Sequence, residues 1–356
     1  MQTQVNKNDF SGQNIYVGID AHLKSWKVTV MMDNLHKRTF SQDPCAETLY
    51  NYLVRNYPGA TYFSAYEAGF SGYWTHYKLC ALGFNSIVVN PADIPTTGKE
   101  KVQKEDARDS QKIARSLRNG ELVPIYIPSL ASLGDRGLMR LRKTVVNDTT
   151  RIKNRIKASL HFNGISIPGE INSPKWNKKL LRWLDGLELG MVEKQIMDSH
   201  LSILYHMRKT TLNVTNQIRT LSKTEKYEQE IKLLMTIPGI GLLTAMTLLT
   251  ELERLDRFNS LDKLCSFIGL VPSTNSSGDT ERTGNITPRG HKVLRAALIE
   301  CAWVAARTDP ALAKSYNQYC KRMKANQAIT RIAKKLLSRI RYVLKNKQPY
   351  VLGVVK

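Results

Sequence analysis

The chain has 356 residues, enough for two or three domains with separate hydrophobic cores. Its formal net charge of +23 exceeds what solubility requires and predicts a polyanionic partner, nucleic acid before a membrane surface. The sequence lacks any apolar run of about eighteen residues, and its five cysteines are scattered without a C-x-x-C pair, which argues against a membrane span, a disulfide framework and a zinc site. The polar N-terminus resembles no signal peptide, so we expect a cytoplasmic, nucleoid-associated protein without a membrane partner.

The first part of the chain predicts an α/β domain with a mixed sheet. Short spacings between its first strands indicate an antiparallel meander, and later strands alternate with helices. The expected strands span residues 15–20, 26–32, 36–41, 60–67 and 85–90. The expected helices span residues 46–56, 72–82 and 106–118.

Two acids end predicted strands. Asp20 closes one strand and Glu67 closes another, and in open α/β sheets ligands bind at that edge. Aspartate is also a common turn residue, so Asp20 alone does not decide between the two interpretations. Glu67 stands beside aromatic residues just before a glycine, where a carboxylate is costly unless it is paired or bound to a metal.

A further pair of acids opens the helix expected at residues 106–118. Asp106 suits the helix start, and Asp109 is three residues on and shares its side of the helix. Two adjacent carboxylates repel each other unless a cation lies between them, which makes the pair a candidate for half of a Mg²⁺ site. The alternative is a solvated first turn, where aspartate is favoured by the helix dipole.

The proline-containing stretch at 124–132 predicts a domain boundary, after which basic residues recur at helical spacing. Long helices are expected at 136–162 and 191–221, joined by a loop at 164–174. They suggest a helical hairpin or coiled-coil arm, with a plain helical bundle as the alternative. We therefore divide the chain into residues 1–128, 129–230 and 231–356.

A glycine turn opens the apolar helix expected at about 242–252, as in a helix-hairpin-helix element. The backbone N–H groups near Gly239 and Gly241 could hold a DNA phosphate without reading sequence. The same turn could instead serve to pack two helices closely.

Residues 269–290 are expected to form a long polar loop between apolar helices. The segment holds Ser276, Ser277 and Arg282, and Arg289 and His291 follow. A serine hydroxyl among basic groups could attack phosphate if it is activated. By composition alone, serine and glycine are ordinary loop residues.

The C-terminal part is expected to be helical, with an apolar helix at 291–308 and basic helices within 311–345. Lys334, Lys335 and Arg339 alternate with aromatic side chains there, a composition that suits a phosphate backbone and unpaired bases. The alternative is a solvated tail helix.

Several short motifs together resemble one family. They are G-I-D-A-H-L-K-S-W at 18–26, Y-E-A-G at 66–69, K-E-D-A-R-D at 104–109, I-P-G-I-G at 237–241, F-I-G-L-V-P at 267–272, S-S-G at 276–278 and G-N-I-T-P-R-G-H-K-V-L-R at 284–295. In this order they resemble the DEDD insertion-sequence transposases, the IS-one-ten and IS-eleven-eleven group that includes Piv-type DNA invertases. The resemblance covers nearly the whole chain. Pro288 stands where the family more often has a basic residue, and His291 replaces a frequent asparagine.

The resemblance implies an N-terminal RuvC-like domain of the ribonuclease-H type, a coiled-coil arm and a mostly helical C-terminal transposase domain. It implies that Asp20, Glu67, Asp106 and Asp109 bind Mg²⁺. It places the nucleophile that forms a covalent phosphoserine at Ser277, with Ser276 as the second choice. It also implies double-stranded DNA substrates, a structured guide RNA and assembly as a dimer or tetramer.

Two alternatives to a serine recombinase remain at this stage. A junction-resolving nuclease would use the four acids with water as the nucleophile. A non-enzymatic nucleic-acid binder would use the acids structurally. The serine-glycine segment favours the recombinase over the nuclease, and the four spaced acids favour either enzyme over the binder.

Overall fold

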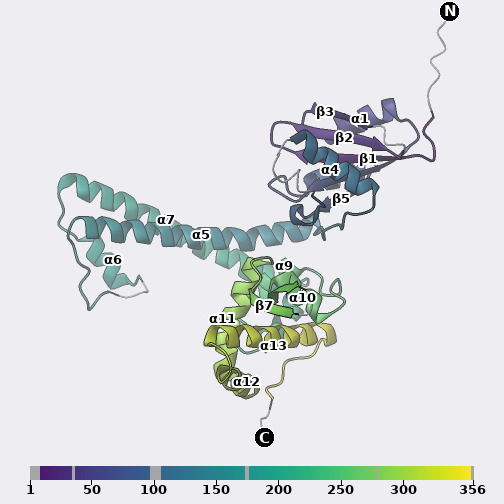
Figure 1. The fold of residues 1–356 in the computed structure, drawn as a ribbon. Coiled ribbons are helices and arrows are strands. Elements are labelled where there is room, and N and C mark those ends of the chain that lie inside the picture. Colours follow the sequence, from purple (N-terminus) through teal and green to yellow (C-terminus); the bar gives the residue numbers. More distant parts are fainter. Residues whose placement is uncertain (1–8, 34–36, 97–105, 173–175, 278–279, 354–356) are drawn as a thin grey trace, which may run out of the picture. The chain divides into compact units, whose positions relative to one another are not determined.

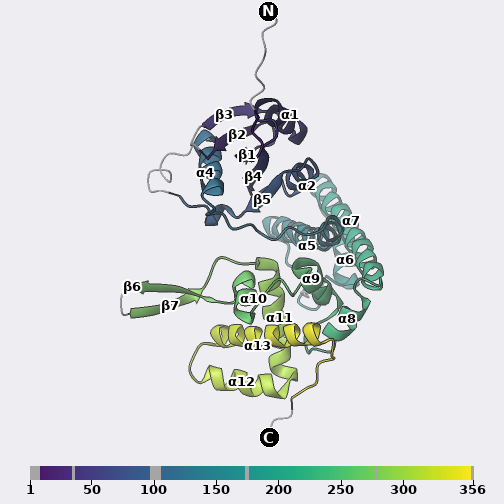
Figure 2. The ribbon, with the colours of Figure 1, turned by 90° about the vertical axis from the view of Figure 1, so that its right-hand side faces the viewer.

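The computed structural model describes residues 9–33, 37–96, 106–172, 176–277 and 280–353 (Figures 1 and 2). The chain separates into two compact units, Met1–Ile127 and Pro128–Lys356, and each is described by itself. The sequence predictions that concern residues 97–105, including Lys104 and Glu105, lie outside the described residues. Within the described residues, no helix combines the length and apolar character needed to cross a bilayer.

The first unit contains the mixed sheet that the sequence predicts. Strands β1, β2 and β3 form the antiparallel meander, and β4 and β5 extend the sheet in parallel from β1, in the order β3-β2-β1-β4-β5. The bounds are β1 Asn14–Ala21, β2 Trp26–Met32, β3 Lys37–Gln42, β4 Thr61–Glu67 and β5 Asn85–Val89.

The two faces of this sheet are covered by different helices. Ile15, Val17 and Ile19 of β1 share one core with Leu49 and Leu53 of helix α1 (Ala46–Asn56), and Leu79 of α2 (Trp74–Ala81) joins them. Side chains alternate along a strand, so the even-numbered β1 residues point to the opposite face. Helix α4 (Asp106–Arg118) packs on that face, and a short 3₁₀ helix, η1 (Pro91–Asp93), precedes it in the chain.

The second unit begins with two long helices that pack along each other, α5 (Leu130–Phe162) and α7 (Met191–Ser222), as Figure 1 shows. The start of α5 lies six residues before the expected position, because Ser129 caps it by accepting a hydrogen bond from the Ser132 N–H. Helix α6 (Lys178–Asp185) was not expected, and its leucines join Ile152, Ile156 and Met197 in a separate core.

The remaining helices enclose the largest core around α13, whose apolar side includes Ile332, Leu336 and Ile340. Their bounds are α8 Glu228–Leu234, α9 Leu242–Leu252, α10 Leu261–Ile268, α11 Lys292–Thr308, α12 Pro310–Cys320 and α13 Ala325–Asn346. The expectation of a loop throughout 269–290 is wrong, because β6 (Pro272–Ser277) and β7 (Thr280–Ile286) pair antiparallel (Figure 2).

Candidate functional site

Asp20 and Glu67 are brought together by the register of two neighbouring parallel strands. The pairing of β1 with β4 runs from Asn14 opposite Thr61 to Ile19 opposite Tyr66, so the next residues along the two strands are Asp20 and Glu67. Partners in this register point to the same face of the sheet. Ile19 and Tyr66 both belong to the core on the α1 side, and the two carboxylates therefore lie on the α4 side.

Gly18 sets how closely α4 approaches this edge. A Cβ added at Gly18 would lie 2.2 Å from the carbonyl oxygen of Ser110 and 2.4 Å from the backbone nitrogen of Ala114. Only glycine allows the helix backbone to contact the strand two residues before Asp20. The Thr29 and Ser110 hydroxyls share a buried 2.8 Å hydrogen bond that ties the same helix turn to β2.

Helix α4 carries the other two predicted acids. Asp106 is its first residue, and the side chain of Asp106 is outside the described part. Asp109 immediately precedes Ser110, the residue in contact with Gly18, and its carboxylate accepts a 3.2 Å hydrogen bond from Lys112. The structure thus brings α4 and the two strand-end acids to one face of the sheet.

Two partners of these acids were not predicted from the sequence. The His22 Nε2 atom lies 3.0 Å from Asp20 Oδ2, and Lys112 Nζ lies 3.2 Å from Asp109 Oδ1. In the sequence, only spacing indicated these contacts: His22 follows Asp20 by two residues, and Lys112 follows Asp109 by three. Among the described side chains, no three His, Cys, Asp or Glu residues are already grouped closely enough to hold a metal, and Asp106 is not among them.

The predicted nucleophiles lie in β6. Ser277 is its last residue and is paired with Thr280, while Ser276 is paired with Glu281 and Asn275 with Arg282. The side chains of Ser276, Ser277 and Arg282 are outside the described part, so only their places in the hairpin are given. Both serines therefore lie at the turn end of a β-hairpin.

The other end of this hairpin is closely packed where it joins α10 and α11. Gly269 and Gly290 are in backbone contact, because a Cβ added at Gly290 would lie 2.5 Å from the Gly269 Cα. Arg295 donates hydrogen bonds to the Gly269 and Thr287 carbonyls at 3.2 and 2.6 Å. Arg289 is exposed at this base, and its N–H donates to the Thr287 hydroxyl.

A buried carboxylate connects this base to the long helices. Glu251 near the end of α9 is only 2% exposed, and it accepts two 2.9 Å hydrogen bonds from Arg140 of α5. The Arg136 Nε atom lies 3.2 Å from the same carboxylate. His291, just before α11, lies 3.1 Å from it through Nε2, while Nδ1 accepts a hydrogen bond from the Leu294 N–H. We call Glu251, Arg136, Arg140 and His291 the charged joint.

Within the charged joint, the Glu251 carboxylate keeps its negative charge at neutral pH. Burial by itself would raise the pKa of Glu251, but hydrogen bonds from His291 and Arg140 outweigh it and hold the pKa at about 2. Arg136 also donates to the Thr250 and Glu251 carbonyls at the end of α9. The His291 ring lies mostly covered within this joint, a position that no local sequence signal indicated, and nucleic-acid binding by His291 stays a prediction.

Comparisons with known proteins match both units. The family model DEDD_Tnp_IS110, described as a transposase, matches residues 17–163, and the model of the transposase IS116/IS110/IS902 family matches residues 231–317. The first match includes Asp20, Glu67, Asp106 and Asp109, and the second includes Ser277 and the base of the hairpin. The chain belongs to the IS110 family of transposases.

Relatives of this IS110-family chain carry transposase names as well. It is 30% identical over 243 residues to the putative transposase y4qE of Sinorhizobium fredii, covering 68% of this chain and 58% of that relative. It is 26% identical over 357 residues to y4rJ of the same organism, covering 91% and 90% of the two chains. It is 22% identical to the transposase for insertion sequence element IS1111A of Coxiella burnetii, covering 66% of this chain and 63% of the relative.

The glycine turn of this IS110-family chain has a packing role. Gly239 has a φ of +86°, and a Cβ there would lie 2.6 Å from the Cys301 carbonyl oxygen of α11. Gly241 precedes α9 as its N-cap, with open space around its Cα. The close approach to α11 explains Gly239 without a phosphate, and phosphate binding at this turn stays a prediction.

The predicted basic residues of α13 have protein partners. Lys334 forms a 3.0 Å ion pair with Asp262, and Lys335 lies over the Tyr319 ring at 5.9 Å. Arg339 forms a 2.8 Å ion pair with Asp309, a fully buried residue that also caps α12. Arg339 therefore neutralises a buried charge, and nucleic-acid binding by these three residues stays a prediction.

Proposed function

We propose that the chain is a divalent-metal-dependent DNA transposase and site-specific recombinase of an insertion sequence. The observation that carries the proposal is the register that sets Asp20 beside Glu67 on the α4 side of the sheet. Membership of the IS110 family supports the same reaction class. A RuvC-like, ribonuclease-H-type fold for residues 1–128 is part of this proposal.

The acids suit a hard divalent cation. Carboxylate oxygens are the ligands that Mg²⁺ prefers, and two of them side by side on one face repel each other without a cation. Asp20, Glu67, Asp106 and Asp109 would hold the ion, which when bound supplies positive charge to a scissile phosphate. Gly18 contributes by letting α4, and with it Asp109, approach the strand ends closely.

Ser277 is the proposed nucleophile, with Ser276 as the second choice. The serine oxygen would form a bond to the scissile phosphorus, while the bond from phosphorus to one deoxyribose oxygen breaks and that oxygen leaves with a proton. The covalent phosphoserine keeps a phosphodiester bond, so the reverse attack by a deoxyribose hydroxyl rejoins strands without a nucleotide cofactor. Arg282 and Arg289 are proposed to stabilise the charge that develops on the phosphate.

The proposed partners are double-stranded DNA at the element ends and the target, a structured guide RNA, and further copies of the chain in a dimer or tetramer. The net charge of +23 supports binding to phosphate backbones. A guide RNA would supply sequence specificity through base pairing, while the protein holds the backbone. Function in the cytoplasm, at the nucleoid, follows from this proposal.

The test is a covalent adduct between the protein and DNA that carries the element ends. The wild type with Mg²⁺ should give an adduct that survives boiling in detergent. Asp20→Asn and Ser277→Ala should each abolish it, whereas Ser276→Ala, the matched control one residue away, should retain it. RNA that copurifies with the protein, if it maps to DNA flanking the element, would identify the guide.

A water-dependent nuclease is the outcome that would replace this proposal. It would cut DNA to free ends, form no adduct, and be unaffected by Ser277→Ala. An adduct that persists in Ser277→Ala and disappears in Ser276→Ala would move the nucleophile by one residue and leave the reaction class intact.

A further inference from the structure

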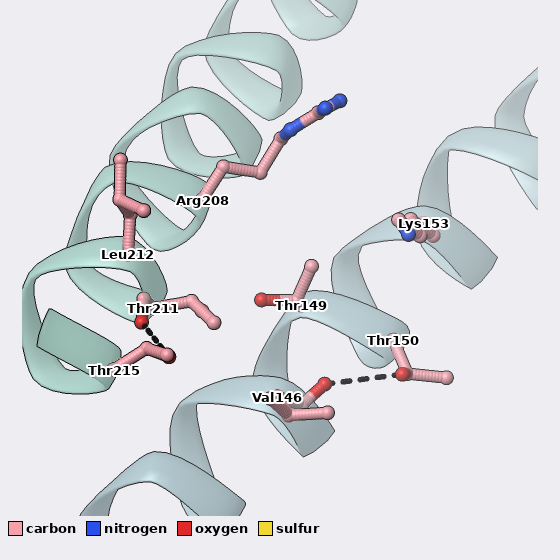
Figure 3. Close-up of a pocket in the computed structure, with 8 residues that line it drawn as sticks. All are labelled: Val146, Thr149, Thr150, Lys153, Arg208, Thr211, Leu212 and Thr215. Carbon is pink, nitrogen blue, oxygen red and sulfur yellow. Dashed lines mark hydrogen bonds between the residues drawn. The ribbon is translucent and has the colours of Figure 1, made fainter. Parts of the chain in front are cut away.

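A groove lies between α5 and α7, and none of the candidate catalytic residues lines it. Its volume is about 390 Å³, and eight residues line it. Val146, Thr149, Thr150 and Lys153 come from α5, and Arg208, Thr211, Leu212 and Thr215 come from α7 (Figure 3). The charged residues of this lining are both cationic.

Lys153 and Arg208 extend from opposite helices at the same end of the groove (Figure 3). Trp176, which is buried, holds both cations in place. The Lys153 ammonium lies over the Trp176 ring at 5.7 Å, and Arg208 Nη1 donates a 3.2 Å hydrogen bond to the Trp176 carbonyl oxygen. The two positive groups are therefore ordered before any ligand binds, which lowers the entropy cost of binding.

Among the side chains that the structure describes, no carboxylate lies within ion-pair distance of Lys153 or Arg208. Burial, followed by the charges of Arg208 and Lys157, lowers the pKa of the Lys153 ammonium below its usual value. An anion placed between the two cations would relieve this repulsion.

The floor of the groove is made of methyl groups and hydroxyl acceptors. Thr149, Thr211 and Thr215 each donate their hydroxyl hydrogen to a backbone carbonyl four residues earlier in the same helix. The Thr149 and Thr211 hydroxyl oxygens can still accept hydrogen bonds, whereas Thr215 already accepts one from Arg142 Nε at 2.9 Å. The threonine methyl groups add to the apolar surface beside Leu212. A ligand with an anionic end and a partly apolar body with N–H or O–H donors fits this lining.

We propose that this groove binds one nucleotide of an unpaired nucleic-acid strand, with its phosphate between Lys153 and Arg208 and its sugar or base over the threonine floor. Charge complementarity selects this occupant, since the whole chain carries +23 and the groove has cations at one end. The proposal does not depend on the strand-transfer reaction proposed above.

The test measures binding of single-stranded RNA and DNA probes of one mixed sequence, about 20 nucleotides long. It uses the full chain with the substitution Glu67→Gln, so that the probes are not cleaved during the measurement. Adding Lys153→Gln with Arg208→Gln should weaken binding roughly tenfold and reduce the slope of log K against log salt by about 0.7, the value for one phosphate of a single strand. The RNA and DNA arms show which strand the groove prefers.

The matched control is Lys143→Gln with Lys209→Gln, the same charge change at two exposed positions on the same helices. It should weaken binding much less. Equal losses in the two pairs would overturn the proposal, as would a Glu67→Gln protein that binds neither probe.

A photo-crosslinking residue in place of Leu212, which is 57% exposed, gives an independent reading. Crosslinks to the probe support the proposal. Crosslinks only to a second copy of the chain would mean that α5 and α7 use the groove for self-association, and would overturn it. Thermal unfolding of each variant, followed by circular dichroism, shows that the helices are retained.

Discussion

The two units position their candidate catalytic residues in different ways. In the first unit, backbone pairing between β1 and β4 sets Asp20 beside Glu67, and direct backbone contact at Gly18 sets α4. In the second unit, the hairpin that carries Ser277 is connected to α5 and α9 by charged side chains around Glu251. Backbone contacts are insensitive to pH, whereas the charged joint is weakened when its carboxylate is protonated. We therefore expect the stability of the second unit to depend more strongly on pH than that of the first.

The largest effect is expected at the charged joint. Glu251→Gln removes the charge that Arg136, Arg140 and His291 contact, and leaving the buried Arg136 unpaired should lower the free energy of unfolding of the second unit by roughly 3–5 kcal/mol. Chemical denaturation followed by hydrogen exchange should show the loss in α5, α9 and α11 and not in β1 or β4. Glu225→Gln, the same change at an exposed position, is the control. Equal protection of α9 in both variants would contradict this role.

The pH dependence of stability should have the same origin. The pKa of Glu251 is about 2 in the folded chain, below its usual value of 4.5, so its stabilising effect is complete above about pH 4.5 and is lost as the pH falls towards 2. The shift corresponds to about 3 kcal/mol. Denaturant titrations between pH 5 and pH 2 should show a steeper fall for the wild type than for Glu251→Gln. Parallel curves would mean that other groups cause the acid sensitivity.

The next effect is expected in the first unit, at the contact between β1 and α4. Gly18→Ala places a methyl group 2.2 Å from a backbone oxygen, so α4 must shift, at a cost near the upper end of roughly 1–3 kcal/mol. The shift would also move Asp109 relative to Asp20. Gly134→Ala is a suitable control, because no atom lies within 4 Å of a Cβ built there. Unchanged stability and unchanged metal affinity in Gly18→Ala would show that α4 is not fixed by this contact.

A smaller effect is expected from the hydroxyl pair on the same face. Thr29→Val removes the 2.8 Å hydrogen bond between Thr29 and the buried Ser110 as well as the 2.9 Å hydrogen bond to Thr39, and should lower the free energy of unfolding by at least about 1 kcal/mol. The measured quantity is the denaturation midpoint of the first unit at neutral pH. The further loss of stability at acid pH should be the same in this variant as in the wild type. Thr39→Val, the outer neighbour in this hydroxyl chain, should cost less. A larger loss in Thr39→Val would contradict the assignment.

Local patterns predicted the first unit well because its elements follow simple alternation. The strands at 15–20 and 60–67 are rich in β-branched and aromatic residues and end in acids, and Asp106 and Arg118 are the bounds of α4 as expected. Once these strands were identified, we could infer that Asp20 and Glu67 lie at one edge of the sheet. Gly18 was part of a motif, but its contact with Ser110 joins residues far apart in the sequence and could not be deduced.

The second unit was harder to predict because its key contacts are distant in sequence. Residues 272–286 are rich in Ser, Thr, Asn and Gly, which suggested a loop although they form a hairpin. Gly134 and Gly137 are unfavourable in helices, so the sequence did not predict the first turns of α5. The Ser129 hydroxyl that caps this helix also donates a hydrogen bond to Glu253, which is distant in sequence. The joint between Glu251 and His291 spans 40 residues and has no local signal.

The most direct test of the central claim measures metal binding at the sheet edge, independent of any DNA substrate. Mn²⁺, which stands in for Mg²⁺, can be titrated into the full-length protein and the free ion counted by electron paramagnetic resonance. Asp20→Asn and Glu67→Gln should each raise the dissociation constant by more than the roughly 10–100-fold typical of a residue that only supports a ligand. Asp33→Asn, an exposed acid in the same unit, should bind like the wild type. Equal Mn²⁺ affinity in all four proteins would contradict the claim that Asp20 and Glu67 form one metal site.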